Sequence, residues 1–161
     1  MKKKLLPVTL AYFLILIAVP CYIIYDYYSI LSTGETYKIE VGAYDPYDPF
    51  RGRYVAIRPL LPELRWQTES VQLIKNDEDF VVAIKRVDDK LSDGVYPTGY
   101  VKKLILERYY LNEKTAPLVE ERQRRAVAEG DLMYLVVKVK NGKYAIAGLY
   151  INDIAAEEYI Q

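Results

Sequence analysis

The first 25 residues constrain this chain most, because three lysines lead into an apolar run, Leu5–Tyr25, that carries no charge before Asp26. A bilayer core about 30 Å thick requires about 20 consecutive apolar residues at a helical rise of about 1.5 Å each. A cleaved secretory signal is the alternative, but its apolar stretch typically spans about 7 to 15 residues and ends in small residues. The run here exceeds that length, and Pro20 stands before Cys21, where a lipoprotein cleavage site has a small residue. The sequence therefore predicts a retained membrane anchor that contacts the lipid bilayer through residues 5–25.

Charge predicts how this anchor is oriented. Lysines occupy positions 2–4 on one side of the span, whereas Asp26 and Glu35 precede the first lysine on the other side, Lys38. Because positive charge is retained on the cytoplasmic side, we expect a single-pass protein of the cytoplasmic (inner) membrane with its amino terminus in the cytoplasm. Residues 1–31 would then form the cytoplasmic tip and the anchor, and residues 32–161 one extracytoplasmic domain. Residues 26–35 are interpreted as a short spacer at this boundary.

Composition narrows what the exported domain can do. About 130 residues remain beyond the anchor, which is enough for one hydrophobic core. The formal net charge is zero, with 22 basic and 22 acidic residues, so no strong positive field favours nucleic acid. The chain has no histidine, and its single cysteine, Cys21, lies inside the apolar run. The domain therefore lacks the commonest general base, the commonest zinc ligand and any thiol, and we expect no metal, no cofactor and no nucleic-acid partner.

The exported sequence predicts a mainly β domain of the α+β class, with one antiparallel β-rich unit and a single helix in its second half. The chain has seventeen tyrosines and three phenylalanines, and tyrosine favours strands. A tyrosine ring can pack against the core of the domain while its hydroxyl remains exposed to solvent. Strands are expected where apolar and polar residues alternate or β-branched residues gather between turn signals. These segments are 37–41, 53–58, 80–87, 95–101 and 104–111.

A helix and a hairpin are predicted near the carboxy terminus. The helix is expected from about 116 to 128, with Thr115 as its cap and Gly130 after its end. The Asn141-Gly142 pair predicts a hairpin between arms 131–140 and 143–151, because a type I′ turn requires positive φ at both positions. One face of the first arm would consist of Met133, Leu135, Val137 and Val139.

The candidate site is the loop 42–52, where Asp45-Pro46 and Asp48-Pro49 are both turn-forming dipeptides. The Arg51 guanidinium can donate two charge-assisted hydrogen bonds to Asp45 or Asp48 and so clamp a loop that its prolines stiffen. This clamp is interpreted either as a structural corner or as a preorganised surface for a partner. The candidate residues are Asp45, Pro46, Asp48, Arg51, Gly52 and Tyr54.

These residues resemble the signature of the GDYXXLXY family of bacterial membrane-anchored proteins. Its members typically carry an apolar segment, a strand ending in Thr-Gly and a core of the form Asp-Pro-x-Asp-x-x-Arg-Gly-Asp-Tyr-Val-x-Leu. The segments 107–113 and 141–150 also resemble the family's aromatic strand before a helix and its closing hairpin. Two departures are Arg53, in place of the aspartate that names the motif, and Pro59, in place of its final tyrosine. The matching residues are Thr33, Gly34, Asp45, Pro46, Asp48, Arg51, Gly52, Tyr54 and Val55.

The resemblance implies a membrane partner rather than a reaction. The family has no established activity, and its members are often encoded beside an uncharacterised multi-pass membrane protein. A chemical step that required the naming aspartate would be lost here, because Arg53 stands in its place. The resemblance therefore favours a structural or binding role for the motif.

Two functions from different classes remain. The first is a non-enzymatic, membrane-anchored domain that binds a partner membrane or envelope protein through the loop Asp45–Tyr54. The second is a membrane-anchored hydrolase with a Ser/Lys dyad or a carboxylate pair, since histidine and cysteine are excluded. The dyad candidates are Ser70 with Lys75 and Ser92 with Lys90, and the carboxylate pair is Asp45 with Asp48. A lysine base requires a lowered pKa, whereas the carboxylates near these lysines would raise it, so the first function is expected.

Overall fold

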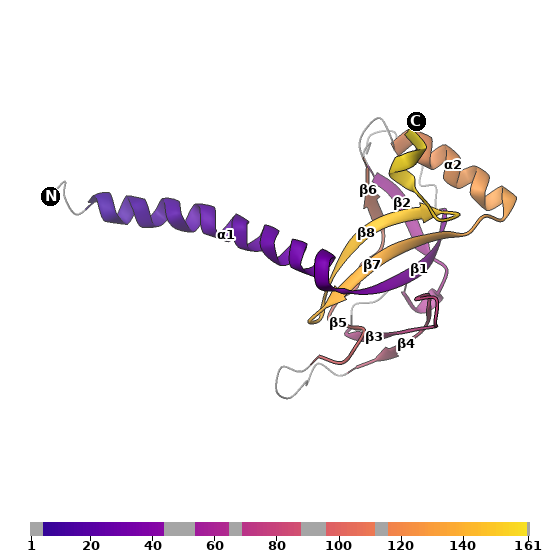
Figure 1. The fold of residues 1–161 in the computed structure, drawn as a ribbon, viewed down its shortest axis with the longest axis horizontal. Helices are drawn as coiled ribbons and strands as arrows, with labels where there is room; N and C mark the ends of the chain where they lie inside the picture. Colours follow the sequence, from indigo (N-terminus) through magenta and orange to yellow (C-terminus); the bar gives the residue numbers. More distant parts are fainter. Residues whose placement is uncertain (1–4, 44–53, 65–68, 88–95, 112–115, 161) are drawn as a thin grey trace.

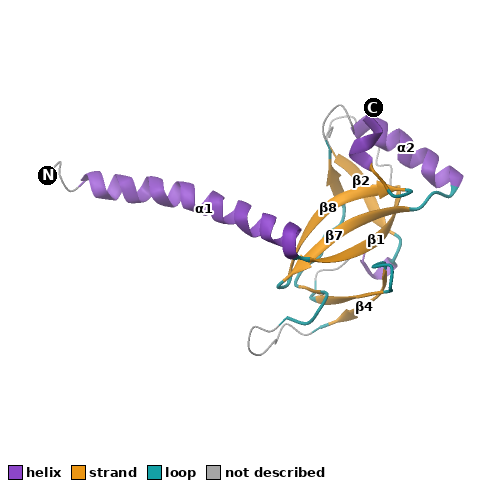
Figure 2. Cartoon of the chain, in the orientation of Figure 1, coloured by secondary structure: helices purple, strands orange, loops and turns teal. Residues whose placement is uncertain are grey.

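The structure, a computed structural model, describes residues 5–43, 54–64, 69–87, 96–111 and 116–160. A long helix leads into a β-rich domain that carries one shorter helix (Figure 1; Figure 2), as the sequence predicts. The helices are α1 (Leu5–Thr33) and α2 (Ala116–Glu129), with 3₁₀ turns η2 (Pro62–Leu64) and η4 (Ala156–Ile160). The strands are β1 (Glu35–Ala43), β2 (Tyr54–Pro59), β3 (Val71–Lys75), β4 (Val81–Arg86), β5 (Tyr100–Val101), β6 (Arg108–Tyr110), β7 (Met133–Lys140), β8 (Lys143–Ile151) and β9 (Ile154–Ala155).

The strands form two antiparallel sheets. The larger sheet has the order β6-β2-β1-β7-β8-β9, and the smaller has the order β4-β3-β5. The first strand of the domain, β1, is at the centre of the larger sheet, paired with β2 on one side and β7 on the other. The carboxy-terminal hairpin is therefore paired with the amino-terminal half of the domain. Successive side chains of a strand point to opposite faces of the sheet, which explains the alternation in the sequence.

The β7–β8 hairpin forms as predicted. Asn141 and Gly142 both have positive φ, 50° and 75°, which is the geometry that a type I′ turn requires. The four residues predicted for one face of the first arm are all buried, and Leu135 has no solvent-accessible surface. Opposite Leu135 on the neighbouring strand is Ile39, which is also buried. This pairing forms the centre of the core.

Helix α2 packs against the larger sheet. Val119 and Ala126 are fully buried, and the helix contacts β1, β2 and η4. The predicted helix, from about 116 to 128, agrees with the observed bounds, and Gly130 after its end has the positive φ of a helix-ending glycine. On the helix, Arg122 forms ion pairs with both Glu129 and Asp131.

The prediction of a spacer over 26–35 is wrong. Helix α1 continues without a break to Thr33, and β1 begins only two residues later. Ile30 is buried against the domain, which stabilises the last helical turns. Helix α1 is long and apolar enough to cross a membrane, and its candidate span is Ala11–Thr33.

The predicted strands 37–41, 53–58 and 80–87 correspond to β1, β2 and β4, and β1 is longer than expected. The remaining two are shorter than expected. In the described part of 95–101 only β5 is a strand, since Gly99 has φ +74° and turns the chain before it. Of 104–111 only β6 is a strand, although Leu104 and Leu106 are buried in the core. Strands β3 and β9 were not predicted at all.

Candidate functional site

The predicted loop falls mainly outside the described residues. Positions 45, 46, 48, 51 and 52 are in the undescribed segment 44–53, so the clamp between Arg51 and its aspartates stays a prediction. Tyr54 is the first residue of β2, and its Cα is opposite that of Tyr110 in β6. The described strands fix where the loop is attached. β1 begins next to α1 and has nine residues, so its far end, Ala43, is about 30 Å from the helix at about 3.3 Å per residue.

The Ser70–Lys75 pair does not form a dyad. The two residues are at opposite ends of β3, which separates their Cα atoms by about 16 Å at about 3.3 Å per residue. Ser70 is buried, its Oγ donates to the carbonyl of Lys102 at 3.2 Å, and it accepts a hydrogen bond from the Tyr100 hydroxyl at 3.1 Å. The second pair, Lys90 and Ser92, lies outside the described residues.

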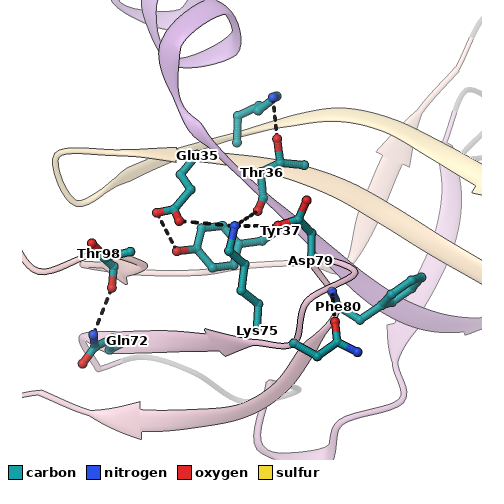
Figure 3. A network of polar contacts seen from close by, with 10 residues as sticks. Glu35, Thr36, Tyr37, Gln72, Lys75, Asp79, Phe80 and Thr98 are labelled. Carbon is teal, nitrogen blue, oxygen red and sulfur yellow. Dashed lines mark hydrogen bonds and ion pairs between the residues drawn. The ribbon is translucent and has the colours of Figure 1, made fainter.

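Lys75 is instead the centre of a polar network that joins the two sheets (Figure 3). Its Nζ donates to Asp79 Oδ1 at 2.6 Å and to the carbonyl of Thr36 at 3.1 Å, and it forms an ion pair with Glu35 Oε1 at 3.2 Å. The Nζ also lies 4.9 Å from the centroid of the Tyr37 ring. Three acceptors thus match the three N–H bonds of one ammonium group.

The contacts of the network shift the pKa values of Asp79, Lys75 and Tyr37. The hydrogen bond from Lys75 lowers the pKa of Asp79 despite the opposing effect of desolvation. Desolvation acts to lower the pKa of Lys75, but its hydrogen bonds to Asp79 and Glu35 outweigh it and raise that pKa. Burial, and then the hydrogen bond to Glu35 at 2.8 Å, raise the pKa of the Tyr37 hydroxyl. A lysine with a raised pKa stays charged at neutral pH and is a poor general base.

The β3–β4 turn holds the acidic side of this network in place. Asp79 has φ +68°, and its carbonyl accepts a hydrogen bond from the backbone of Lys38 in β1 at 2.8 Å. Asn76 Oδ1 accepts from the backbone N–H groups of Glu78 and Phe80, which closes the turn. This network was not predicted from the sequence. A signal was present, because Lys75 and Asp79 flank the turn and the residues between them are polar.

A cleft lies beside the network, with a volume of about 490 Å³. Its lining combines Ile39 and Phe80 with the segment that follows β2 and with Glu40 and Glu78. Three apolar residues in its lining, Leu60, Val82 and Leu132, are each exposed by 41% or more. Among the described residues, no group of three or more acidic, cysteine or histidine side chains could hold a metal ion.

A second polar cluster, which we call the helix–hairpin junction, fixes α1 to the tip of the β7–β8 hairpin. Lys143 Nζ forms an ion pair with Asp26 at 2.7 Å. Lys140 Nζ donates to Ser29 Oγ and Thr33 Oγ1, both at 2.7 Å. Figure 1 shows the hairpin tip lying beside the last turns of the helix.

Gly34 closes this junction. Its backbone N–H donates to the carbonyl of Ile30 at 2.8 Å. A Cβ atom at Gly34 would lie 2.4 Å from that same carbonyl oxygen, which is closer than real Cβ contacts allow. Only glycine fits where the helix turns directly into β1.

The sequence of the chain matches the GDYXXLXY protein family over residues 16–149, which is most of its length. The chain belongs to the GDYXXLXY family. No curated protein and no solved structure matches it.

The structure gives physical roles to several GDYXXLXY positions. Thr33 and Gly34 form the helix–hairpin junction, where Thr33 Oγ1 donates to the Ser29 carbonyl and accepts from Lys140. In the aromatic strand, Tyr109 is buried and its hydroxyl donates to Glu157, and burial followed by that hydrogen bond raises its pKa. Pro59, which replaces the final tyrosine of the motif, ends β2 opposite Val41. These roles are structural, since each joins one element to another.

Proposed function

We propose that this GDYXXLXY protein is a single-pass membrane protein whose domain lies on the extracytoplasmic side and binds a partner membrane or envelope protein without catalysis. The observation that carries the proposal is the helix–hairpin junction. Helix α1 does not end in a flexible linker, but is fixed to β7 and β8 through Lys140 and Lys143. A domain fixed to its anchor is held at one height and in one orientation, which lowers the entropy cost of binding a partner in the same membrane.

The partner-binding surface is assigned to the loop Asp45–Tyr54. The described ends of β1 and β2 place its attachment points at the end of the sheet away from α1 (Figure 1). A partner that contacts this loop therefore has to extend about 30 Å beyond the membrane surface, judged from the nine residues of β1. This suits the extracytoplasmic part of a multi-pass membrane protein or an envelope protein.

The hydrolase alternative is weakened, because Ser70 and Lys75 lie too far apart to form a Ser/Lys dyad. Ser70 has its Oγ bonded to Tyr100 and to the Lys102 carbonyl, at the opposite end of β3 from Lys75. The charge of Lys75 is stabilised by two carboxylates rather than suppressed. The carboxylate pair Asp45 and Asp48 remains the catalytic alternative.

Two experiments test the proposal. Protease added to cells stripped of any outer barrier should digest the domain beyond Ser32, whereas a protected or secreted domain would refute the anchor or its orientation. The full chain, purified in mild detergent, should retain a membrane or envelope protein in near-equal amount. Arg51→Ala should lose this partner, and Arg53→Asp, which restores the residue usual in the family, should keep it. If both variants retain the partner, the loop is not the binding surface.

A further inference from the structure

The hairpin tip and the segment that pairs with it gather lysines close to α1. Lys140 and Lys143 flank the turn, and the backbone N–H of Lys102 donates to the Gly142 carbonyl at 2.9 Å, which brings Lys102 and Lys103 alongside the tip. The side chains of Lys102, Lys103 and Lys143 are exposed. We call these four lysines the tip patch.

The charge of the tip patch is largely uncompensated among the described residues. Lys143 is paired with Asp26, and that hydrogen bond raises the pKa of the Lys143 amine. The contacts of Lys140 are to the neutral hydroxyls of Ser29 and Thr33. One carboxylate therefore faces four ammonium groups, and the remaining positive charge favours an anionic ligand.

The junction places the tip patch at the level of lipid headgroups. The apolar run ends at Tyr25, and Asp26 is the first charged residue after it. Ser29, which contacts Lys140, is four residues beyond Tyr25 along α1, or about 6 Å at about 1.5 Å per residue. The headgroup layer on one side of a bilayer is about 5 to 7 Å thick, so both contacts fall within or at the edge of that layer.

Aromatic residues near the patch agree with this depth. Tyr22 and Tyr25 are exposed on the helix, and the side chain of Tyr96 is 37% exposed. Tyr96 stacks on Tyr100 with a centroid distance of 5.4 Å, and an added Cβ at Gly142 would contact both rings. A tyrosine side chain has an apolar ring and a polar hydroxyl, and such side chains are typical of the membrane interface.

We propose that the tip patch binds the phosphate groups of anionic lipids in the outer half of the same membrane that α1 crosses. This rests on the proposed single-pass topology, since only a membrane-spanning α1 brings the patch to the headgroups. Lys102 and Lys103 contact the lipid, and Lys140 and Lys143 also hold the tip at the correct height. The interaction fixes the rotation of the domain about the helix axis.

The test uses the full chain in mild detergent, with native mass spectrometry to measure binding of phosphatidylglycerol and of phosphatidylcholine. The variant is Lys102→Gln/Lys103→Gln, which leaves the junction contacts intact. The control is Lys85→Gln, an exposed lysine on β4. One lysine at an anionic surface contributes about five-fold in association, so the preference of the wild type for phosphatidylglycerol should fall at least five-fold in the double variant. The control should retain the preference.

Equal binding of the two lipids by the wild type would overturn the proposal, and so would an unchanged preference in the double variant. Displacement of the lipid by inorganic phosphate would also overturn it, because it would indicate a simple anion site. Flotation of the same wild-type protein with vesicles reports on the anchor separately. Protein that floats but shows no lipid preference refutes the tip patch alone, whereas protein that does not float refutes the proposed topology.

Discussion

Replacing Lys75 with methionine should destabilise the domain by separating the two sheets at their polar contact. Methionine keeps most of the length of the side chain and can still pack against the Tyr37 ring. It cannot donate to the Thr36 carbonyl or to the carboxylates of Glu35 and Asp79, which Lys75 contacts at 3.1, 3.2 and 2.6 Å. The two carboxylates and the Tyr37 hydroxyl would then lose the one ammonium group that contacts both carboxylates.

The magnitude follows from the exposure of the site. Hydrogen bonds to charged groups contribute about 1.5 to 3 kcal/mol each when buried. Here the side chains of Lys75 and Glu35 are 25% and 38% exposed, so solvent screens the interaction. We expect Lys75→Met to lower the free energy of unfolding by about 2 kcal/mol in total. For a domain of this size, this corresponds to a decrease in Tm of roughly 6 to 10 °C.

The effect should depend on pH in a defined direction. The pKa of Asp79 is lowered in the folded state, so its stabilising contribution is present above its unfolded pKa of about 3.9 and is lost as the pH falls through the lower folded value. The pKa of Lys75 is raised, so its contribution is complete below about 10.4 and is lost as the pH rises through the higher folded value. The difference in Tm between wild type and variant should therefore be largest between about pH 4 and 10.

Thermal unfolding of the full chain in mild detergent, followed by circular dichroism in the β region, measures this difference. Lys85→Met, on the exposed edge strand β4, is the matched control and should change Tm little. A Tm for Lys75→Met equal to that of the control would refute the network as a source of stability. A difference that is as large near pH 2 as at neutral pH would refute the role of the carboxylates.

Two further predictions concern the junction and the loop. Gly34→Ala should lower the Tm and increase protease cleavage between α1 and β1, because its Cβ would clash with the Ile30 carbonyl; unchanged cleavage would refute the tight junction. Arg51→Ala should cost roughly 1 to 3 kcal/mol in the free energy of unfolding if the predicted clamp exists. It should then be non-additive with Asp45→Asn in a double-mutant cycle of denaturant unfolding, whereas additive effects would mean that the two residues share no contact.

The parts of the fold that the sequence predicted are those that local chemistry determines. The Asn141-Gly142 turn requires positive φ whatever surrounds it, and α2 is followed by Gly130, whose positive φ is typical of a glycine that ends a helix, while the predicted cap Thr115 lies outside the described residues. The end of α1 was mispredicted because Ser32, Thr33 and Gly34 together are typical of a break in a helix, but Thr33 is part of α1. In the structure its hydroxyl bonds to the Ser29 carbonyl and to Lys140, more than 100 residues away in sequence, so a distant contact stabilises the last turn.

The same reasoning explains what was missed near the candidate site. β3 has only five residues, and its alternation is interrupted by exposed Ile74, so it becomes a strand only by pairing with β4 and β5. The network around Lys75 brings together Glu35 and Asp79, which are 44 positions apart in sequence. The resemblance to the GDYXXLXY family identified the loop 42–52, but a family signature does not reveal which distant charges become neighbours.

In the proposed single-pass topology, the direct passage from α1 into β1 couples the orientation of the domain to the tilt of the helix. The helix ends at Thr33 and the strand begins at Glu35, so a change in the tilt of the helix moves the whole sheet with it. Membrane helices adjust their tilt when bilayer thickness changes. With an arm of about 30 Å along β1, a tilt of about 10° displaces the far end of the domain by about 5 Å. The attachment points of the loop Asp45–Tyr54 are at that far end, so under the proposed function the thickness of the membrane sets the height at which the loop meets its partner.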